Sequence, residues 1–429
     1  MSKIAIKARF IYYNNKIHEN THLIVDGECI QGIQKTPPEG CKVIDRSGSG
    51  IFPGFINAHT HLPMSMFRGL ADDLPLKEWL EGHIWPAENK MLDDEFVYDA
   101  TLLASAEMIR TGTVCANDMY FYSGQIGKAL SDVGLKGVIG AGVLDFPTKF
   151  SRSFDEYLAK AEVLIDKFKD SSLIKVALCP HAPYTVNPEN YKKCVRFCSE
   201  KGILIHTHLS ETRWEVEEIN KRYGKSPVKL MDETGFFDIN SISAHVVWVD
   251  DEEIEILGKK GASIVSCIES NLKLSSGFAP IYKMKNAGVN VTIGTDGNAS
   301  NNDLNMLSEI STFSKVHKGL NFDPTFFKSG EIIDIATKNA ARALNLKRCG
   351  ELKKGNFADF FIISFDDINM MPVYNPISHL VFTAEPLNIT DLYVNGKCLM
   401  DNGKLTTIDL DYLKEKIRYW ENKIKKVIK

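Results

Sequence analysis

Short apolar runs alternate with longer helical stretches between about residues 51 and 345. The runs have the length and composition of buried strands, and the stretches between them carry apolar residues at helical spacing. Eight strand–helix units predict a parallel sheet, and eight such strands close naturally into a TIM-type (β/α)₈ barrel of the α/β class. The predicted strands end at His61, Asp118, Leu144, His181, His208, His245, Cys267 and Asp296.

The two ends of the chain have the alternating pattern of β-strands instead. Residues 1 to about 50 show it, and Gly355–Phe365 and Asp391–Met400 are similar, the last with a hairpin signal at Asn395–Gly396. Neither end is large enough to bury a core alone, so we expect both to combine into one small β-sandwich domain, with the barrel inserted between them. The predicted division is 1–50 (first part of the sandwich), 51–349 (barrel) and 350–429 (second part plus a C-terminal helix).

Bulk composition narrows the class of protein. The chain has 429 residues, is 44% hydrophobic and carries a formal charge of −4, without a basic stripe that would indicate a nucleic-acid partner. Its nine cysteines include no Cys-x-x-Cys pair, which is typical of reduced thiols in the cytoplasm. The absence of signal-like or membrane-spanning apolar runs also favours the cytoplasm and no membrane partner. Leu410–Lys429 predicts an amphipathic helix packed on the body.

Two histidines one residue apart follow the first barrel strand. His59 and His61 should point the same way, because side chains alternate along a strand, and two imidazoles there make half of a metal site. Alone, the pair would be interpreted more simply as unrelated surface or core histidines. His208 and Asp296 end later strands, however, and a barrel brings such ends together. We therefore expect one divalent ion on His59, His61, His208 and Asp296, with its bound water at a pKa of about 7.

Three more polar residues lie near the same strand ends. Glu211 follows His208 and could pass a proton to a leaving group, although a solvated loop acid is the alternative interpretation. His245 is expected to orient the attacking hydroxide, with a satisfied core histidine as the alternative. His206 is expected to lie behind the ligands or in the core.

Several sequence blocks resemble those of a known enzyme family. Residues 53–64, Pro-Gly-Phe-Ile-Asn-Ala-His-Thr-His-Leu-Pro-Met, are similar to the signature of the amidohydrolase superfamily. Four later blocks resemble its 5′-methylthioadenosine/S-adenosylhomocysteine deaminase branch: Cys-Pro-His-Ala-Pro-Tyr-Thr (179–185), His-Leu-Ser-Glu-Thr (208–212), Ser-Asn-Leu-Lys-Leu (270–274) and Gly-Thr-Asp-Gly-Asn-Ala-Ser-Asn-Asn (294–302). The resemblance covers nearly the whole chain.

The resemblance implies a mononuclear metal enzyme that deaminates by hydrolysis. The ion would be zinc, with iron as the alternative. Asp296 would take a proton from the water, Glu211 would protonate the ring nitrogen beside the amino-bearing carbon, and His245 would polarise the hydroxide.

The substrate implied is a small-molecule nucleoside. His181 matches a residue that contacts the nucleoside, and Glu88 matches the acid that binds the ribose hydroxyls, which suits a carboxylate because it can accept from both. Ser300 would line the same pocket, and Trp79 could supply an apolar wall or simply belong to the core. Arg152 would grip the carboxylate of a longer substrate or be a plain surface residue.

Two other functional classes remain open from the sequence. The same chemistry could act on adenosine, guanine, 8-oxoguanine or a triazine, although Glu88 favours a ribosyl substrate. A metal-free scaffold protein is the non-enzymatic alternative, and the full set of expected ligands argues against it. A homo-oligomer is compatible with the sequence.

Overall fold

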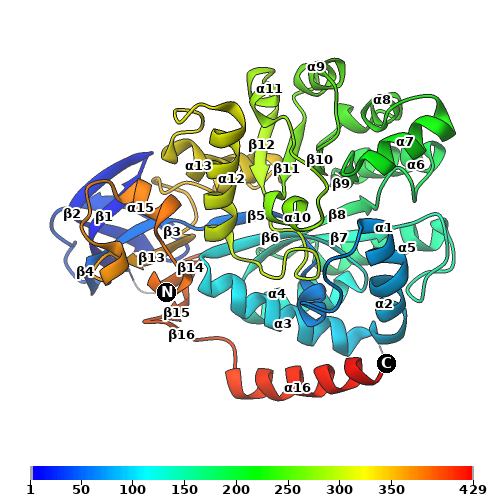
Figure 1. Ribbon diagram of the computed structural model, residues 1–429. Coiled ribbons are helices and arrows are strands. Elements are labelled where there is room, and N and C mark those ends of the chain that lie inside the picture. The colour runs from blue at the N-terminus through cyan, green and yellow to red at the C-terminus, as the bar shows by residue number, and fades with distance from the viewer. Residues whose placement is uncertain (1–2, 428–429) are drawn as a thin grey trace.

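The computed structural model describes residues 3–427, which fold into a parallel barrel and a second, mixed sheet (Figure 1). The barrel strands pair in chain order, each parallel to the next. Their bounds are β5 Phe55–Thr60, β6 Thr113–Tyr120, β7 Lys136–Val143, β8 Ile174–Pro180, β9 Leu204–Leu209, β10 Ser241–His245, β11 Ser263–Ser266 and β12 Asn290–Ile293. The predicted barrel is confirmed, with most strand ends within two residues of the expected positions.

Backbone contacts join the first and last strands of the barrel. The backbone N–H of Asp296, just beyond β12, donates to the carbonyl oxygen of His59 in β5 at 3.0 Å. Gly294 permits this approach, because a Cβ there would lie 2.5 Å from the backbone nitrogen of His59. Two predicted metal ligands therefore meet at the seam where the barrel closes.

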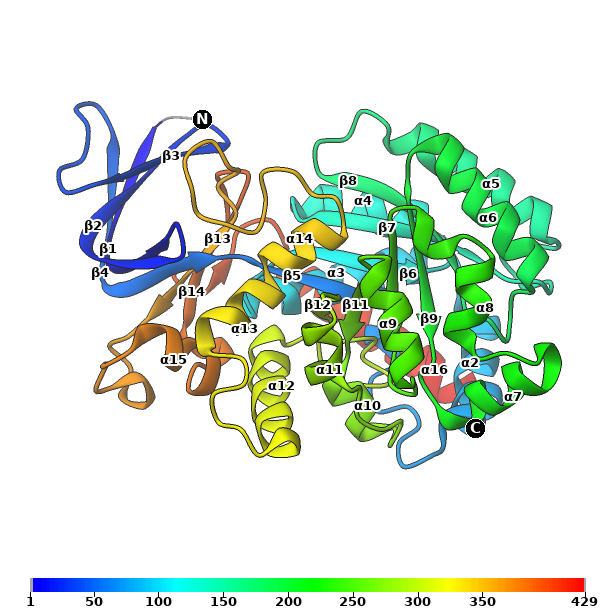
Figure 2. The same ribbon diagram turned by 90° about the horizontal axis from the view of Figure 1, so that it is seen from above.

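Helices surround the barrel strands, as the view in Figure 2 shows. Many begin at a polar cap: the Ser153 side chain accepts from the N–H of Glu156, and Asp250 forms a capping box with Glu253. The helical bounds are η1 Leu62–Phe67, α1 Leu76–Glu78, η2 Trp79–Ile84 (a π-helix), α2 Trp85–Met91, α3 Asp94–Arg110, α4 Ser123–Val133, α5 Phe154–Phe168, α6 Pro188–Lys201, α7 Arg213–Tyr223, α8 Pro227–Glu233, η3 Phe236–Asp238, α9 Asp251–Lys259, α10 Ile268–Lys273, α11 Ile281–Asn286, α12 Met306–Asn321, α13 Ser329–Ala336, α14 Lys338–Ala343, η4 Ile368–Met370, α15 Pro376–Phe382, η5 Pro386–Asn388 and α16 Leu410–Val427.

The two ends of the chain meet in one mixed eight-stranded sheet beside the barrel (Figure 2). Its order is β16-β15-β14-β13-β4-β1-β2-β3, with β1 parallel to β4 and β13 antiparallel to it. The bounds are β1 Ile4–Tyr13, β2 Lys16–Asp26, β3 Cys29–Gln34, β4 Lys42–Pro53, β13 Phe360–Ser364, β14 Ile389–Val394, β15 Lys397–Asp401 and β16 Lys404–Leu405. The expected union of both ends is thus present. We propose domain boundaries at 50/51 and 349/350, although the last three residues of β4, which belongs to the mixed sheet, fall in the range assigned to the barrel.

The predicted amphipathic C-terminal helix is α16, which lies along α3 (Figure 1). Trp420 is fully buried there, and its indole N–H donates to the Asp99 carboxylate at 2.8 Å. The last two residues of the predicted segment, Ile428 and Lys429, lie outside the described residues. Across residues 3–427, we find no helix with both the length and the apolar character that a bilayer crossing requires.

Candidate metal and active site

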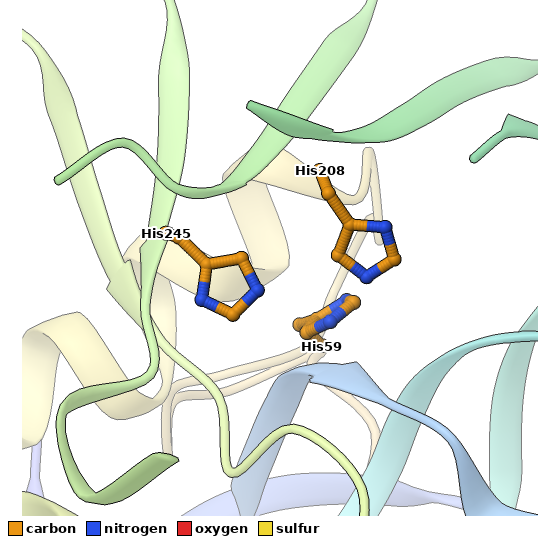
Figure 3. Close-up of side chains that lie close together, drawn as sticks. All are labelled: His59, His208 and His245. Carbon is orange, nitrogen blue, oxygen red and sulfur yellow. The ribbon is translucent and has the colours of Figure 1, made fainter. Parts of the chain in front are cut away.

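The candidate site lies at the carboxyl ends of the barrel strands, around a cavity of about 250 Å³. β5 brings His59 and His61 to this end, β9 brings His208, and β10 brings His245. Figure 3 shows the rings of His59, His208 and His245 converging from three different segments. Asp296 joins them from the loop after β12. The four side chains expected to hold an ion are thus brought together.

The ligand atoms approach closely enough to share one cation. Asp296 Oδ1 lies 3.2 Å from His61 Nε2 and 3.3 Å from His59 Nε2. His208 Nε2 lies 3.2 Å from His61 Nε2. Two sets, His59–His61–Asp296 and His59–His208–His245, each have ligand atoms within 4.8 Å of one another. Imidazole nitrogens and carboxylate oxygens are among the donors that hold zinc in catalytic sites.

The hydrogen bonds of these rings show that the site is arranged for a cation. His61 Nδ1–H donates to the carbonyl oxygen of Met119 at 2.5 Å, and His208 Nδ1–H donates to that of His181 at 2.8 Å. With both rings neutral, the two Nε2 atoms would present lone pairs to each other, a repulsive contact that a cation or a proton at this point removes. His59 Nε2 is also buried without a hydrogen bond of good geometry. These residues fit a divalent ion.

The electrostatics of the cluster also favour a positive charge. Burial lowers the pKa of His61, but the hydrogen bond and charge of Asp296, the Met119 carbonyl and the Asp118 charge together outweigh burial and raise the pKa to about 9. Burial lowers the pKa of His59 to about 4. Burial works to raise the pKa of Asp296, yet the two histidines hold it well below its usual value. The carboxylate is therefore ionised, and its neighbourhood accepts one positive charge.

The Asp296 carboxylate is held in one orientation by two hydroxyl groups. Ser270 Oγ and Ser300 Oγ each donate to Oδ2 at 2.7 Å. The backbone of Asp296 has a φ of +64°, in the left-handed region that non-glycine residues seldom adopt. Oδ1 is therefore the oxygen left to face His59 and His61. Ser300 lines the cavity as expected, and it also orients the aspartate.

Glu211 is a buried acid at the same cavity. Burial raises its pKa, and the nearby Asp296 charge adds to the rise. Ser276 Oγ donates to Glu211 Oε1 at 3.3 Å, and His245 Nε2 lies 3.8 Å from Oε2. The solvated-loop interpretation does not suit a side chain with this burial. Its geometry is that of an acid able to give a proton to a bound ligand.

A second glutamate fixes the turn that carries Glu211. The Glu215 carboxylate accepts from the backbone N–H of Ser210 at 2.8 Å and from that of Glu211 at 2.9 Å. Ser210 has a φ of +50°, so this turn is unusual and needs such support. Sequence reasoning missed Glu215, although an acid four residues after Glu211 in the first turn of α7 is suited to bind backbone N–H groups.

His245 has one ring nitrogen fixed and the other directed to the site. Its Nδ1–H donates to Asn271 Oδ1 at 3.0 Å, so Nε2 keeps a lone pair near Glu211. Its backbone φ is +71°. His206 lies behind the cluster, as expected: its Nε2 is 3.1 Å from His59 Nδ1, and its Nδ1 is 3.0 Å from Asn117 Nδ2. His206 therefore fixes the orientation of His59.

Most, but not all, of the residues expected to bind substrate line the cavity. Glu88 lines the cavity, and Tyr120 Oη donates to its Oε1 at 2.5 Å. Burial raises the pKa of Glu88 to about 7, although the Tyr120 hydrogen bond works against the rise. Tyr120 was missed in the sequence, where it follows Asp118 at the strand period of two. Trp79 also lines the cavity, and its indole N–H is buried without a partner.

His181 and Arg152 differ sharply in position. His181 lines the cavity, and its Nδ1 lies 2.9 Å from Thr185 Oγ1, whose own proton goes to the carbonyl oxygen of Ala182. His181 Nδ1 is thus the donor, and Nε2 is an acceptor for a ligand. Arg152 is exposed and does not line the cavity; Lys149 is the cation at its wall.

Comparison with known proteins agrees with this geometry. The sequence model of the amidohydrolase family matches residues 51–399. The chain is 42% identical to a 5-methylthioadenosine/S-adenosylhomocysteine deaminase of Thermodesulfovibrio yellowstonii, covering 98% of both chains, and 42% identical to one of Aquifex aeolicus, covering 89% of this chain and 88% of the relative.

A solved structure, an adenosine deaminase from Xanthomonas campestris with bound zinc, superposes with a TM-score of 0.95 at 35% identity, covering 99% of both chains. The match therefore spans both the barrel and the mixed sheet. With the family signature, the near-full-length relatives and the histidine–aspartate cluster in agreement, the chain belongs to the amidohydrolase family.

Proposed function

We propose that this protein is a metal-dependent hydrolytic deaminase that converts the 6-amino group of an adenosine derivative, 5′-methylthioadenosine or S-adenosylhomocysteine, into the inosine analogue and releases ammonia. One observation carries the proposal: a single cavity joins a cluster able to hold a cation with a buried acid, Glu211, whose pKa is raised. The near-full-length relatives support the choice of substrate.

The proposed ligands of one zinc ion per chain are His59, His61, His208 and Asp296, and the zinc-bound relative supports zinc over iron. When bound, such an ion supplies a water that ionises near neutral pH, with a pKa of about 7. Asp296 accepts the proton of the attacking water, since its carboxylate is ionised and fixed by Ser270 and Ser300.

Glu211 then acts as the acid. It protonates the ring nitrogen next to the amino-bearing carbon, which makes that carbon more electrophilic. His245 accepts a hydrogen bond from the attacking water through its free Nε2, because its Nδ1 is committed to Asn271. The proton held by Asp296 then passes to the leaving amine and ammonia departs, while the remaining proton of the added water leaves the ring oxygen as the carbonyl forms and returns to Glu211. Each of these groups is buried, which strengthens the electrostatic effect of each transfer.

The nucleoside would occupy the cavity with its base toward the histidines. Glu88 accepts from the two ribose hydroxyls, and Tyr120 holds the carboxylate in place. His181 Nε2 accepts a hydrogen bond from the ligand, and Trp79 packs against it with an indole N–H available for an acceptor. A bare base has no diol to satisfy Glu88, which favours a nucleoside over guanine, 8-oxoguanine or a triazine.

A substrate panel with metal analysis tests the proposal. Ultraviolet change and ammonia release are followed with 5′-methylthioadenosine, S-adenosylhomocysteine, adenosine, guanine and a chlorotriazine. We expect turnover of the adenosine derivatives and about one zinc per chain. Turnover confined to guanine or the triazine would refute the substrate class. A protein purified without chelator that contains neither zinc nor iron and turns over none of the compounds would favour the scaffold alternative.

A further inference from the structure

The cavity has a polar inner half and an apolar outer half. The inner half holds the histidines, Asp296, Glu211 and Glu88. The outer half is walled mainly by aromatic side chains from the π-helix, α2, the end of β6 and the loop after β7. These are Trp79, Trp85, Phe121, Tyr122, Phe146 and Phe150.

The aromatic wall contains two groups of packed rings. Phe121 and Tyr122 lie 5.8 and 5.1 Å from Phe150 between ring centroids. Phe146 lies 6.3 Å from Trp85 between ring centroids. Ring pairs at these separations attract each other beyond the area they bury. The loop after β7 therefore presents a fixed apolar surface to whatever extends beyond the ribose site.

Charged groups are scarce in this outer half. Among the described residues lining the cavity, every carboxylate belongs to the inner half, and Lys149 is the one lysine or arginine. Lys149 is exposed, and its Nζ donates to the carbonyl oxygen of Leu92 at the end of α2, 2.6 Å away. An ion pair formed by such an exposed ammonium contributes little to binding.

The only arginine in the loop after β7 adds no charge to the outer half of the cavity. Arg152 is exposed and absent from the cavity lining. Its backbone N–H donates to Glu156 Oε2 at 2.8 Å, which holds this part of the loop at the start of α5. The outer half therefore presents no guanidinium for bidentate binding of a carboxylate.

We infer that the cavity selects adenosine derivatives with an apolar 5′ substituent, such as an alkylthio group, over those with an amino-acid substituent. The inference rests on the proposed function. With the base at the histidines and the ribose diol at Glu88, the 5′ substituent extends into the aromatic half. A methylthio group gains from leaving water there. An amino-acid group meets no guanidinium and no carboxylate among the residues that line this outer half, so its charged ends gain little there to offset any loss of hydration.

The test compares kcat/KM of the metal-loaded protein for 5′-methylthioadenosine, adenosine and S-adenosylhomocysteine. We expect the methylthio compound to exceed S-adenosylhomocysteine by about tenfold or more, and also to exceed adenosine. A ratio of methylthio to S-adenosylhomocysteine near one, or an inverted ratio, would overturn the inference and leave the proposed function intact. Failure to turn over any adenosine derivative would instead refute the proposed function.

A charge-insertion variant tests the cause of the preference. Phe146 is 40% exposed at the wall, so Phe146→Arg should fold, and it places a guanidinium beside the 5′ substituent. In this variant we expect the ratio of kcat/KM for 5′-methylthioadenosine to that for S-adenosylhomocysteine to fall about tenfold. Phe322→Arg is the matched control, because Phe322 is 94% exposed and does not line the cavity, and its ratio should stay unchanged. An unchanged ratio in folded Phe146→Arg would overturn the charge argument.

Discussion

Removal of the Tyr120 hydroxyl should weaken nucleoside binding through Glu88. Tyr120 is buried at the end of β6, and its hydroxyl donates to Glu88 Oε1 at 2.5 Å. In Tyr120→Phe the ring stays in place and the hydrogen bond is lost. The carboxylate then has one fewer donor to stabilise its charge and to fix its position under the ribose.

The size of the effect follows from the charge on Glu88. A hydrogen bond to a charged group contributes about 1.5–3 kcal/mol, which corresponds to about 10-fold to 150-fold in kcat/KM for a nucleoside. Burial raises the pKa of Glu88 to about 7, and the Tyr120 hydrogen bond lowers it, so losing that bond raises the pKa further. An ionised Glu88 binds the diol best. The value of kcat/KM should therefore fall as the pH drops through the pKa of Glu88. In Tyr120→Phe this fall on the acidic side of the pH profile should occur at higher pH.

The assay measures kcat/KM against pH for adenosine and 2′,3′-dideoxyadenosine in wild type and variant. The loss should appear with adenosine and shrink to near nothing with the dideoxy compound, which lacks the hydroxyls that Glu88 binds. Tyr122→Phe is the control, because its hydroxyl is not bonded to Glu88. An equal loss on both substrates, or a fall on the acidic side at an unchanged pH, would refute the role of Tyr120 as a positioning residue.

Three further variants or treatments test the remaining parts of the site. Glu211→Gln should lose about 10²–10⁴ in turnover while retaining its metal, and near-normal turnover would remove Glu211 from the chemistry. His206→Gln should weaken zinc affinity about 10- to 100-fold in a chelator competition, whereas His317→Gln, at a buried histidine outside the site, should not. Chelation should abolish activity and lower Tm, since an ion at about 100 times its Kd adds about 2.7 kcal/mol of stability; restoration by zinc completes the check.

The barrel and its metal residues could be predicted because they depend on local patterns. Buried parallel strands have apolar runs, and their polar ends must meet at one face of a closed barrel. His59 and His61 share a side through the strand period alone. The way the chain ends join was predicted only in outline, because the pairing of Ile362 with Ile51 joins segments with no local signal for each other.

The supporting residues could not be predicted, because their roles depend on backbone turns. Glu215 meets the Ser210 and Glu211 N–H groups only because Ser210 adopts a positive φ. The loop after β7 carries no fixed motif, so its sequence does not show which side chain faces the cavity. Lys149 does so, while Arg152, expected either to bind a substrate carboxylate or to be a plain surface residue, is exposed and lies outside the lining.

The unusual backbone at these strand ends explains how the cluster can be rigid before an ion binds. Ser210, His245, Val246 and Asp296 all have positive φ, at a cost of about 1–3 kcal/mol each. Backbone hydrogen bonds between neighbouring strand ends impose these conformations: the N–H of Val246 donates to the carbonyl oxygen of Leu209, and that of Asp296 donates to that of His59. The hydrogen bonds of the folded barrel therefore offset the free-energy cost of these positive φ angles. Its turns direct the imidazoles and the carboxylate into one small volume, so an arriving ion need not organise its own ligands.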